Sequence, residues 1–408
     1  MSVIVATKEE VQEYYGSDAL GQSKLKLLLG DLGSFHKEFD SSAEHFMIGS
    51  AVDCILTNSI DAFNQEYYIS SVDKLPSEAV IEILNLVYND LLQDYAEHLE
   101  VLTGQEEPLP VTPFNEFVGE LGNWSTYILS ACEQTGWQPR WGADAKLKNI
   151  IEPGSTYFLD MCLGFGKTII SQTQNNTIKN IVHSLETNPR TGRFFDRNFY
   201  ADMPETNPRT GRFFDRNFYA DMPELTVYYQ FPIYFEYRGV SCKALLDMVF
   251  VERDIEGKIL SITGVDLKTM NGNTFYFPSS VKARRYDIQA AWYTLALHNH
   301  FAVPEGSDVI KPFQFVVEST SYQGKPLNFI VDSSLLKIGR FGRRAISLHY
   351  TDMFNGDTMA SAILQYEIKG FEQLLDLYIY HSENGFTEER EIQEAGLNPL
   401  VINWDGVI

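Results

Sequence analysis

The chain has 408 residues, of which 44% are hydrophobic, and a formal net charge of -23 at pH 7. This hydrophobic share excludes a disordered protein, and the acidic excess excludes one that binds nucleic acid over its whole surface, because such binding needs clustered Lys and Arg. No apolar run approaches the roughly 20 residues of a membrane span, and the N-terminus lacks a secretion signal, so we expect a cytoplasmic protein with no membrane partner.

Helical periodicity dominates the first part of the chain. Leucines at helical spacing predict an amphipathic helix over residues 23–39. Similar patterns predict helices over residues 48–57, 78–102 and 112–135. Residues 1–150 are therefore expected to form a mostly helical N-terminal part.

A perfect tandem duplication follows. The segment ETNPRTGRFFDRNFYADMP occupies residues 186–204 and again, unchanged, residues 205–223. Solenoid repeats drift in sequence and need several units to bury a core, so two identical copies do not indicate that architecture. Because surface insertions cost little loop entropy, we expect one copy to be a neutral surface loop or helical extension. Residues 151–223 are thus predicted to be a helical and loop connector.

After residue 223 the pattern becomes that of a sheet. Residues 225–235, 240–251 and 259–268 are rich in Val, Tyr, Phe and Ile, which predicts strands. The helical period returns over residues 278–301, and a further strand is predicted over residues 313–319. This order predicts an α+β fold with a central mixed sheet flanked by helices. Residues 224–350 would form its core, and residues 351–408 a helical tail.

Two of these strands carry acidic residues among apolar neighbours. Asp266 and Lys268 are two residues apart in GVDLKT and so share one face of a strand, and Asp247 lies in the preceding strand segment LLDMV. A carboxylate there is costly unless it binds a cation or hydrogen-bond donors. Two carboxylates and the main-chain carbonyl of Leu267 would suit Mg²⁺ or Mn²⁺. Such a site supports phosphodiester hydrolysis, with Lys268 stabilising the transition state; a structural ion pair is the alternative.

The helix predicted after these strands carries a polar stripe. Arg285, Gln289 and Tyr293 are spaced by four residues, so they share one side of a helix whose adjacent face is apolar. Gln289 could hold Lys268 or a nucleic-acid backbone, and Tyr293 could stack or donate to a phosphate. A surface Gln and a core Tyr are the alternative interpretation.

Two groups of basic residues are candidate DNA contacts, with solvated helix faces as the alternative. They comprise Lys282, Arg284 and Arg285, and then Lys337, Arg340, Arg343 and Arg344.

The motifs LDMV, GVDLKT and RYDIQAAWY, in this order, resemble the PD-(D/E)xK nuclease superfamily with its QxxxY element, and in particular the RecE-type (exonuclease VIII-like) phage recombination exonucleases. QSKLKLLL and HFMIGSAVDCILTN are similar to helices of that group, and the resemblance extends over residues 22–350. It implies a restriction-endonuclease-like core and an enzyme that digests linear duplex DNA from its ends, 5′ to 3′, to leave 3′ single strands. The implied catalytic residues are Asp247, Asp266, Lys268, Gln289 and Tyr293.

The metal ligands depart from this group at one position. Where the group has a histidine after G-S-A-V, this chain has Asp53, which can also bind Mg²⁺. His45, eight residues earlier, is expected to be structural. Glu224, at the start of the first predicted strand, is similar to an acidic residue of the group and is a further candidate ligand. The expected set is Asp247, Asp266, the Leu267 carbonyl, Asp53 and Glu224.

Other cofactors are not expected. Related nucleases hold an iron–sulfur cluster through three late cysteines, but no cysteine follows Cys242. LGFGKTII at residues 163–170 ends like a phosphate-binding loop, yet Met161 stands where its first glycine is required, so ATP is not implied. The expected partners are duplex DNA ends and a single-strand annealing protein, a homo-oligomer is left open, and a phage protein would act in the host cytoplasm.

Two other functions stay open. The same fold could serve an endonuclease or a single-strand-specific nuclease. A degenerate, non-catalytic DNA-binding phage protein is the third reading: Asp53 in place of histidine keeps it open, whereas the intact Asp247, Asp266 and Lys268 weigh against it.

Overall fold

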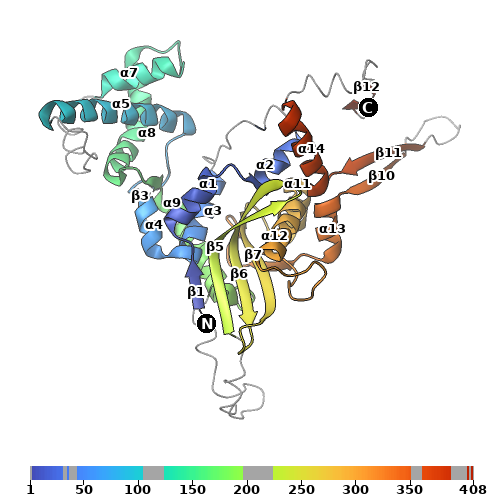
Figure 1. The fold of residues 1–408 in the computed structure, drawn as a ribbon. Coiled ribbons are helices and arrows are strands. Elements are labelled where there is room, and N and C mark those ends of the chain that lie inside the picture. Colours follow the sequence, from blue (N-terminus) through green and yellow to red (C-terminus); the bar gives the residue numbers. More distant parts are fainter. Residues whose placement is uncertain are drawn as a thin grey trace. The chain divides into compact units, whose positions relative to one another are not determined.

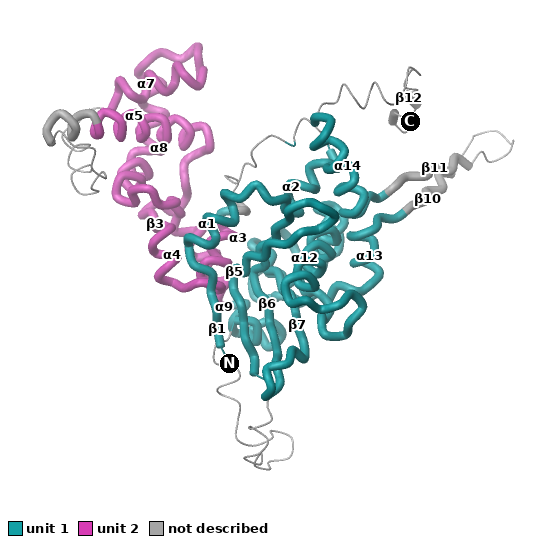
Figure 2. The backbone as a smooth tube through the Cα atoms, in the orientation of Figure 1, with its two compact units in different colours: residues 1–47, 184–408 teal, residues 48–183 magenta. Residues whose placement is uncertain are grey.

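The chain forms two compact units (Figure 2). The computed structural model describes residues 2–30, 35, 44–103, 124–195, 224–350, 361–386, 402–403 and 406–407. Residues 1–47 and 184–408 make up what we call the sheet unit, and residues 48–183 the helical unit. We expected the helical N-terminal part to end at residue 150, but helix α8 (Ala143–Gly164) continues through that position. The first 47 residues, which we also assigned to that part, belong to the sheet unit.

A mixed sheet forms the centre of the sheet unit (Figure 1). Its main strands, in spatial order, are β1 (Ser2–Val5), β5 (Glu224–Tyr237), β6 (Val240–Arg253), β7 (Ile259–Met270), β8 (Gln314–Ser319) and β9 (Leu327–Ile330). The β1–β5 and β7–β8 pairs are parallel, and the others are antiparallel. Short β2 (Leu20–Gly21) also pairs with β6. The predicted α+β class with a central mixed sheet is confirmed.

A long hairpin of β5 and β6 sets the register near the acidic residues. Its two-residue turn, Arg238 and Gly239, has φ angles of 53° and 76°, as a type I′ turn requires, and such turns match the twist of the flanking strands. The aromatic and β-branched residues of both strands favour this extended pairing. Tyr229 is thereby paired with Met248, and Phe231 with Leu246.

Helices connect β7 to β8, because parallel strands need a crossover. The connection consists of α11 (Phe277–Arg284) and α12 (Tyr286–His300), separated by Arg285 at φ 51°. Helix α12 contacts β5, β6 and β7, and it packs closely on β7: a Cβ at Gly264 would lie 2.9 Å from Phe313 and 3.1 Å from Leu297.

Two further helices, α13 (Ser333–Phe341) and α14 (Phe371–Asn384), complete the layer over the sheet. Helix α13 packs on α12, and α14 packs on α13 and on α2 (Gln22–Lys26). Residues on every side of α12 are buried, including Gln289 and Tyr293 of the predicted polar stripe.

The helical unit has its own apolar core. It contains α4 (Ile60–Glu66), α5 (Glu78–Thr103), α7 (Ser125–Gln134) and α8, with the parallel pair β3 (Tyr67–Ile69) and β4 (Thr168–Ile170). The buried carboxylate of Asp160 accepts hydrogen bonds from the Ser70 hydroxyl and the Ser71 N–H. This acid therefore fixes the β3 end of the unit.

Several predicted helices are confirmed and others change. The predicted helix over residues 48–57 corresponds to α3 (Glu44–Asp53) and a π-helical turn (Cys54–Asn58), and the one over 78–102 to α5. The helix predicted over 23–39 is interrupted at Gly30, which caps the 3-10 turn (Leu27–Leu29) that follows α2, and residues 31–34 and 36–39 lie outside the described residues. Residues 112–123 lie outside the described residues.

The predicted helical tail is only partly helical. Strand β11 (Ser361–Ile368) pairs with β10 (Arg343–Tyr350), and short β12 (Ile402–Asn403) pairs with β13 (Gly406–Val407). Helix α14 is part of the main core rather than an appendage, because Phe371, Leu374 and Leu375 are fully buried. Among the residues that the structure describes, no helix combines the length and hydropathy of a membrane span.

Residues 186–195, the described part of the first copy of the duplicated segment, are packed into the sheet unit. The opening residues of this copy end helix α9 (Gln172–Thr187), and a 3-10 turn follows (Gly192–Phe194). Phe194 and Phe195 are buried, and the Tyr229 hydroxyl donates a hydrogen bond to the Phe194 carbonyl. The second copy, residues 205–223, lies outside the described residues.

Candidate active site

Asp266 and Lys268 lie side by side on β7, on the face covered by α12. Asp266 is 1% exposed, and the Nζ of Lys268 lies 2.5 Å from its Oδ2. The Nε2 of Gln289, from α12, donates a hydrogen bond of 2.8 Å to Oδ1. These two partners offset the cost of burying a carboxylate, since charge-assisted hydrogen bonds are the strong ones.

Asp247 joins this group from β6. The β6–β7 ladder ends with Met248 paired to Val265, and beyond it the Oδ2 of Asp247 accepts a hydrogen bond of 2.7 Å from the N–H of Leu267. The N–H and C=O of a strand residue point toward the same neighbour. The Leu267 carbonyl is therefore directed toward the edge where Asp247 lies, so two carboxylates and one carbonyl converge.

The charges of this group follow from burial and from its neighbours. Burial raises the pKa of Asp266, and Lys268 opposes the rise. For Lys268, burial acts to lower the pKa, but Asp266, Asp247 and Tyr286 outweigh it and the net shift is upward. Lys268 is thus an ammonium at neutral pH. Burial, and next Asp266, raise the pKa of Tyr293 well above its ordinary value, so Tyr293 is a neutral phenol.

Helix α12 brings Gln289 and Tyr293 to the two acids. Both side chains are buried, and besides its bond to Asp266 the Gln289 amide forms a hydrogen bond with Tyr293. Gln289 therefore contacts Asp266, whereas we expected Lys268 or a nucleic-acid backbone as its partner. The buried Tyr293 ring is packed against Phe313, so it is not available for stacking on a ligand.

Arg285 does not belong to the expected stripe. It precedes α12 in the left-handed conformation, and its guanidinium donates to both carboxylate oxygens of Asp287, at 2.9 Å each, and to the Lys369 carbonyl at 2.6 Å. The helical spacing failed here because the chain turns at Arg285, and the side chain forms a structural ion pair.

The structure adds Lys26 and Tyr286 to the group. The Nζ atoms of Lys26 and Lys268 lie 5.8 Å and 5.2 Å from the centre of the Tyr286 ring. Burial, and then Lys268, lower the pKa of Lys26 to about 8. Lys26 lies far from the other residues in sequence, on the helix predicted from residue 23, so no local motif identified this second cation.

Gln230 lies on β5, the strand next to Asp247 of β6. The flanking pairs, Tyr229 with Met248 and Phe231 with Leu246, place it opposite Asp247. It is buried and has a φ of 50° in the middle of a strand. A residue other than glycine rarely adopts this conformation, and such strain is concentrated at functional sites. No sequence pattern predicts this positive φ angle, since strand propensity does not indicate the conformation of a single residue within a strand.

One expected metal ligand, Glu224, is not brought to this group. Glu224 pairs with Arg253 at the far end of β5, six residues from Gln230, which is about 20 Å along a strand. Glu224 was predicted as a ligand from its similarity to a residue of the family, and that similarity does not report its distance from the other acids. Asp53 ends α3 and belongs to the helical unit, so its role as a ligand stays a prediction.

The remaining donor set fits a hard cation. Within the described part of the chain, no three or more His, Cys, Asp and Glu side chains are arranged to hold a metal ion. Mg²⁺, however, keeps several waters and is bound through one or two carboxylates together with substrate phosphates. Asp247, Asp266 and the Leu267 carbonyl are all oxygen donors, which suits Mg²⁺ or Mn²⁺ rather than zinc.

The predicted DNA-binding residues separate into two kinds. Arg340 is engaged in a network with Glu305 at 2.7 Å, Glu372 at 3.0 Å and the Tyr237 hydroxyl at 3.0 Å. Like Arg285 it forms structural ion pairs, because each nitrogen of its guanidinium donates to another residue of the chain.

A groove of about 900 Å³ retains other basic residues. Lys282 and Arg343 are exposed and line it together with Lys369, while Arg284 and Lys337 are exposed elsewhere on α11 and α13. Its apolar lining includes Phe277, Phe315 and Phe329. The side chain of Arg344 lies outside the described residues.

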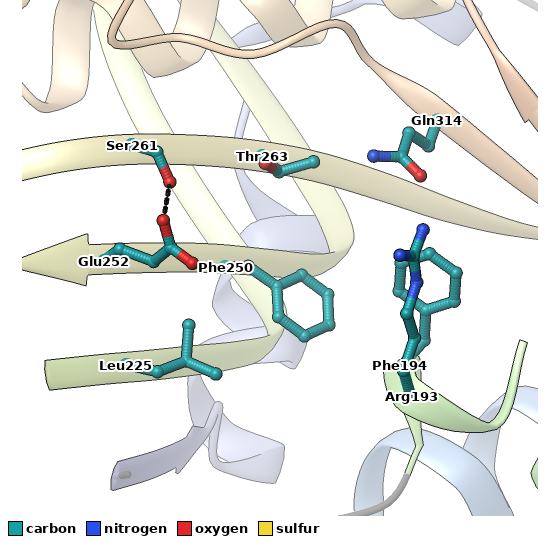
Figure 3. A pocket seen from close by; sticks show the side chains of 8 residues that line it. All are labelled: Arg193, Phe194, Leu225, Phe250, Glu252, Ser261, Thr263 and Gln314. Atoms are coloured by element: carbon teal, nitrogen blue, oxygen red, sulfur yellow. Dashed lines mark hydrogen bonds between the residues drawn. The ribbon is translucent and has the colours of Figure 1, made fainter. Parts of the chain in front are cut away.

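A second cavity, of about 160 Å³, lies on the other face of the sheet. Figure 3 shows Ser261 and Thr263 of β7 pointing into it with Arg193, while Glu252 accepts a hydrogen bond of 2.6 Å from Ser261. Odd-numbered residues of β7 face this cavity, whereas Asp266 and Lys268 face the opposite side. The cavity therefore contains none of the predicted site residues.

Comparisons with known proteins give little beyond this geometry. No protein-family model matches the sequence, and no curated protein matches it significantly. Among solved structures, the chain is similar to the Eubacterium rectale protein named "Putative exonuclease", with 14% identity and a TM-score of 0.35, over 81% of this chain and 80% of that chain. A likeness of this size does not establish a shared function.

Proposed function

We propose that this chain is a metal-dependent deoxyribonuclease of the PD-(D/E)xK type, centred on Asp247, Asp266 and Lys268. The observation that carries the proposal is the buried Asp266 carboxylate, held between Lys268 and Gln289 with Asp247 bonded to the adjacent main-chain amide. A purely structural ion pair needs no second carboxylate. Two neighbouring acids, one of them buried, disfavour each other's charge unless a cation joins them.

Asp247, Asp266 and the Leu267 carbonyl would hold Mg²⁺ or Mn²⁺, and Asp53 is a proposed further ligand. When bound, the ion lowers the pKa of the attacking water and neutralises charge on the phosphate. Glu224 is left out of this set because of its position on β5.

The protein side chains have separate roles in this proposal. Lys268 stays protonated, and we assign it to orienting the water and stabilising the charge that develops on the phosphate. Gln289 fixes the orientation of Asp266 through its hydrogen bond. Tyr293, as a buried neutral phenol, supports Gln289 and excludes water from the helix side of the site.

The proposed substrate is linear duplex DNA, digested from its ends in the 5′ to 3′ direction to leave 3′ single strands for phage-type recombination. The motif order supports this choice by resemblance, and a single-strand annealing protein would be the partner that receives the product. The basic residues Lys282, Arg284 and Arg343 support local phosphate binding. The acidic remainder of the chain would keep that contact local.

The test is incubation of the purified chain with end-labelled linear duplex and with closed circular duplex, in Mg²⁺ or in EDTA. We expect Mg²⁺-dependent loss of linear DNA, resistant circles, no cleavage in EDTA, and earlier release of a 5′ label than of a 3′ label. Asp266→Asn is the matched control for a contaminating nuclease. Circles cut as fast as linear DNA would identify an endonuclease, and no cleavage of either substrate would leave a degenerate DNA-binding protein.

A further inference from the structure

Three exposed aromatic rings lie on loops next to the candidate site. Phe275 and Tyr276, in the 3-10 turn Thr274–Tyr276, are 70% and 69% exposed, and Tyr322 is 65% exposed. We call these three residues the aromatic rim. Scattered exposed apolar residues are ordinary, but several grouped together indicate a binding surface.

The two loops that carry the rim leave the same end of the sheet and are tied together. Parallel β7 and β8 end with Met270 paired to Ser319. Across the loops, the Thr320 N–H donates to the Met270 carbonyl at 2.9 Å, and the Thr274 hydroxyl donates to the Lys325 carbonyl at 3.0 Å. Rings from both loops are therefore held in one region.

A buried carboxylate anchors the loop of Tyr322. Glu318 is fully buried and accepts hydrogen bonds from the Ser319 N–H at 2.6 Å, from the Gly324 N–H at 3.2 Å and from the Ser184 hydroxyl. An ordered loop presents its exposed ring at little cost in conformational entropy when a ligand binds.

The rim is continuous with the candidate site. Lys268 lies two residues before the end of β7, and its Nζ is 5.2 Å from the centre of the Tyr286 ring. Phe277 stacks on Tyr286, with ring centroids 5.8 Å apart. In the sequence Phe277 directly follows Tyr276, which belongs to the rim. A strand whose phosphate reaches Lys268 would thus bring its neighbouring bases to the rim.

The charge around the rim suits a polyanion. Residues 267–286 and 319–331 contain no Asp or Glu, although the chain has 55 acidic residues. The same segments contain the exposed Lys282, Arg284 and Lys325, whereas Lys268 and Arg285 are paired with Asp266 and Asp287 just outside them.

We propose that the aromatic rim binds the unpaired bases of a single DNA strand at the entrance to the candidate site. The inference rests on the proposed function for the choice of DNA, and it narrows the bound form to a frayed or single-stranded end. Aromatic rings stack on any base, so such binding tolerates every sequence. In a duplex the bases already stack on each other and are not offered to the rim.

The experiment measures binding without cleavage. Fluorescence anisotropy in EDTA would compare a labelled single-stranded oligothymidine with a blunt duplex of equal length, using the full chain. The variants are Phe275→Ala, Tyr276→Ala, Tyr322→Ala and their combination. Ile255→Ala is the control, because Ile255 is 72% exposed at the turn that opens β7, away from the rim. All four side chains are exposed, so folding should be unaffected.

We expect each rim substitution to weaken single-strand binding by about 5- to 100-fold, the range of one base stacked on a ring, while duplex affinity changes less than about twofold and Tyr322→Phe binds like wild type. The idea is overturned if the triple variant binds the single strand as wild type does, if both substrates lose affinity equally, or if the wild type does not bind a single strand. Nuclease activity is read separately in Mg²⁺. Ring-dependent binding without cleavage would remove the proposed function only, and cleavage with ring-independent binding would remove this inference only.

Discussion

Two buried ion pairs lie close together in the sheet unit, and they are built differently. In the Arg285–Asp287 pair, the guanidinium meets both carboxylate oxygens at 2.9 Å and also a main-chain carbonyl. In the Asp266–Lys268 pair, a single ammonium meets one oxygen at 2.5 Å, and Gln289 takes the other.

The difference separates scaffold from chemistry. A guanidinium forms a planar fork that matches a carboxylate and holds a fixed geometry, whereas an ammonium is a point charge on a flexible stem. Arg285 therefore holds both oxygens of Asp287 in a fixed geometry. Asp266 has an exchangeable partner and a second acid, Asp247, close by. We expect substitutions in the two pairs to give opposite patterns of activity and stability.

Asp266→Asn should show the largest effect on activity. The amide keeps an oxygen for the Gln289 bond but cannot bind a cation as a carboxylate does, so cleavage of linear duplex should fall by about 10³-fold or more. Mg²⁺ should also lose its stabilising effect on the folded chain. The checks are a nuclease assay and melting curves with Mg²⁺ and with EDTA. Activity within tenfold of wild type would place the metal centre elsewhere.

Lys268→Ala should be inactive in another way. Loss of the ammonium should lower the rate by about 10² to 10³-fold, the scale of one charge-stabilising donor, yet both carboxylates remain to bind metal. Without Lys268 the burial that raises the pKa of Asp266 is opposed only by the weaker effect of Lys26. The stabilisation by Mg²⁺ should therefore grow as the pH rises, because the cation competes with a proton. A variant whose melting temperature ignores Mg²⁺ at every pH would contradict this role.

Arg285→Met should reverse the pattern. It leaves Asp287, whose side chain is 5% exposed, without its partner, and the free energy of unfolding should fall by about 3–5 kcal/mol. The folded fraction should keep cleavage within a few-fold of wild type. Urea titration measures the loss, and the double variant Arg285→Met with Asp287→Leu should recover much of it. A stable but inactive Arg285→Met variant would contradict this prediction and indicate that the Arg285–Asp287 pair takes part in catalysis.

The sequence predicted the fold class and the core of the site for physical reasons that are local. Alternation along a strand places Asp266 and Lys268 on one face, and helical spacing relates Gln289 to Tyr293. Both periodicities depend only on residues close in sequence. Apolar neighbours also indicated burial of both acids, which the structure shows for Asp266.

The failures come from tertiary structure. The left-handed turn at Arg285 removed it from the helical stripe, and the register of β5 placed Glu224 at the wrong end of its strand. Lys26 reaches the site from a distant helix, and no pattern predicts which distant side chains meet. The aromatic rim depends on exposure, which propensity does not report.

The smallest effect is expected from removing one copy of the duplicated segment, a change that touches neither ion pair. Deleting residues 186–204 or 205–223 gives the same sequence, because the copies are identical. One full copy remains to end α9 and to bury the Phe194 and Phe195 rings under the sheet. We expect unfolding free energy within about 0.5 kcal/mol of wild type, since shortening a loop changes closure entropy only slowly.

Deleting residues 186–223 removes both aromatic rings and should instead destabilise the chain strongly, by about 3–5 kcal/mol for each buried Phe lost. Melting curves of the two deletions, with cleavage measured on the same samples, test this, and a single-copy chain that melts as early as the double deletion would show that both copies are needed.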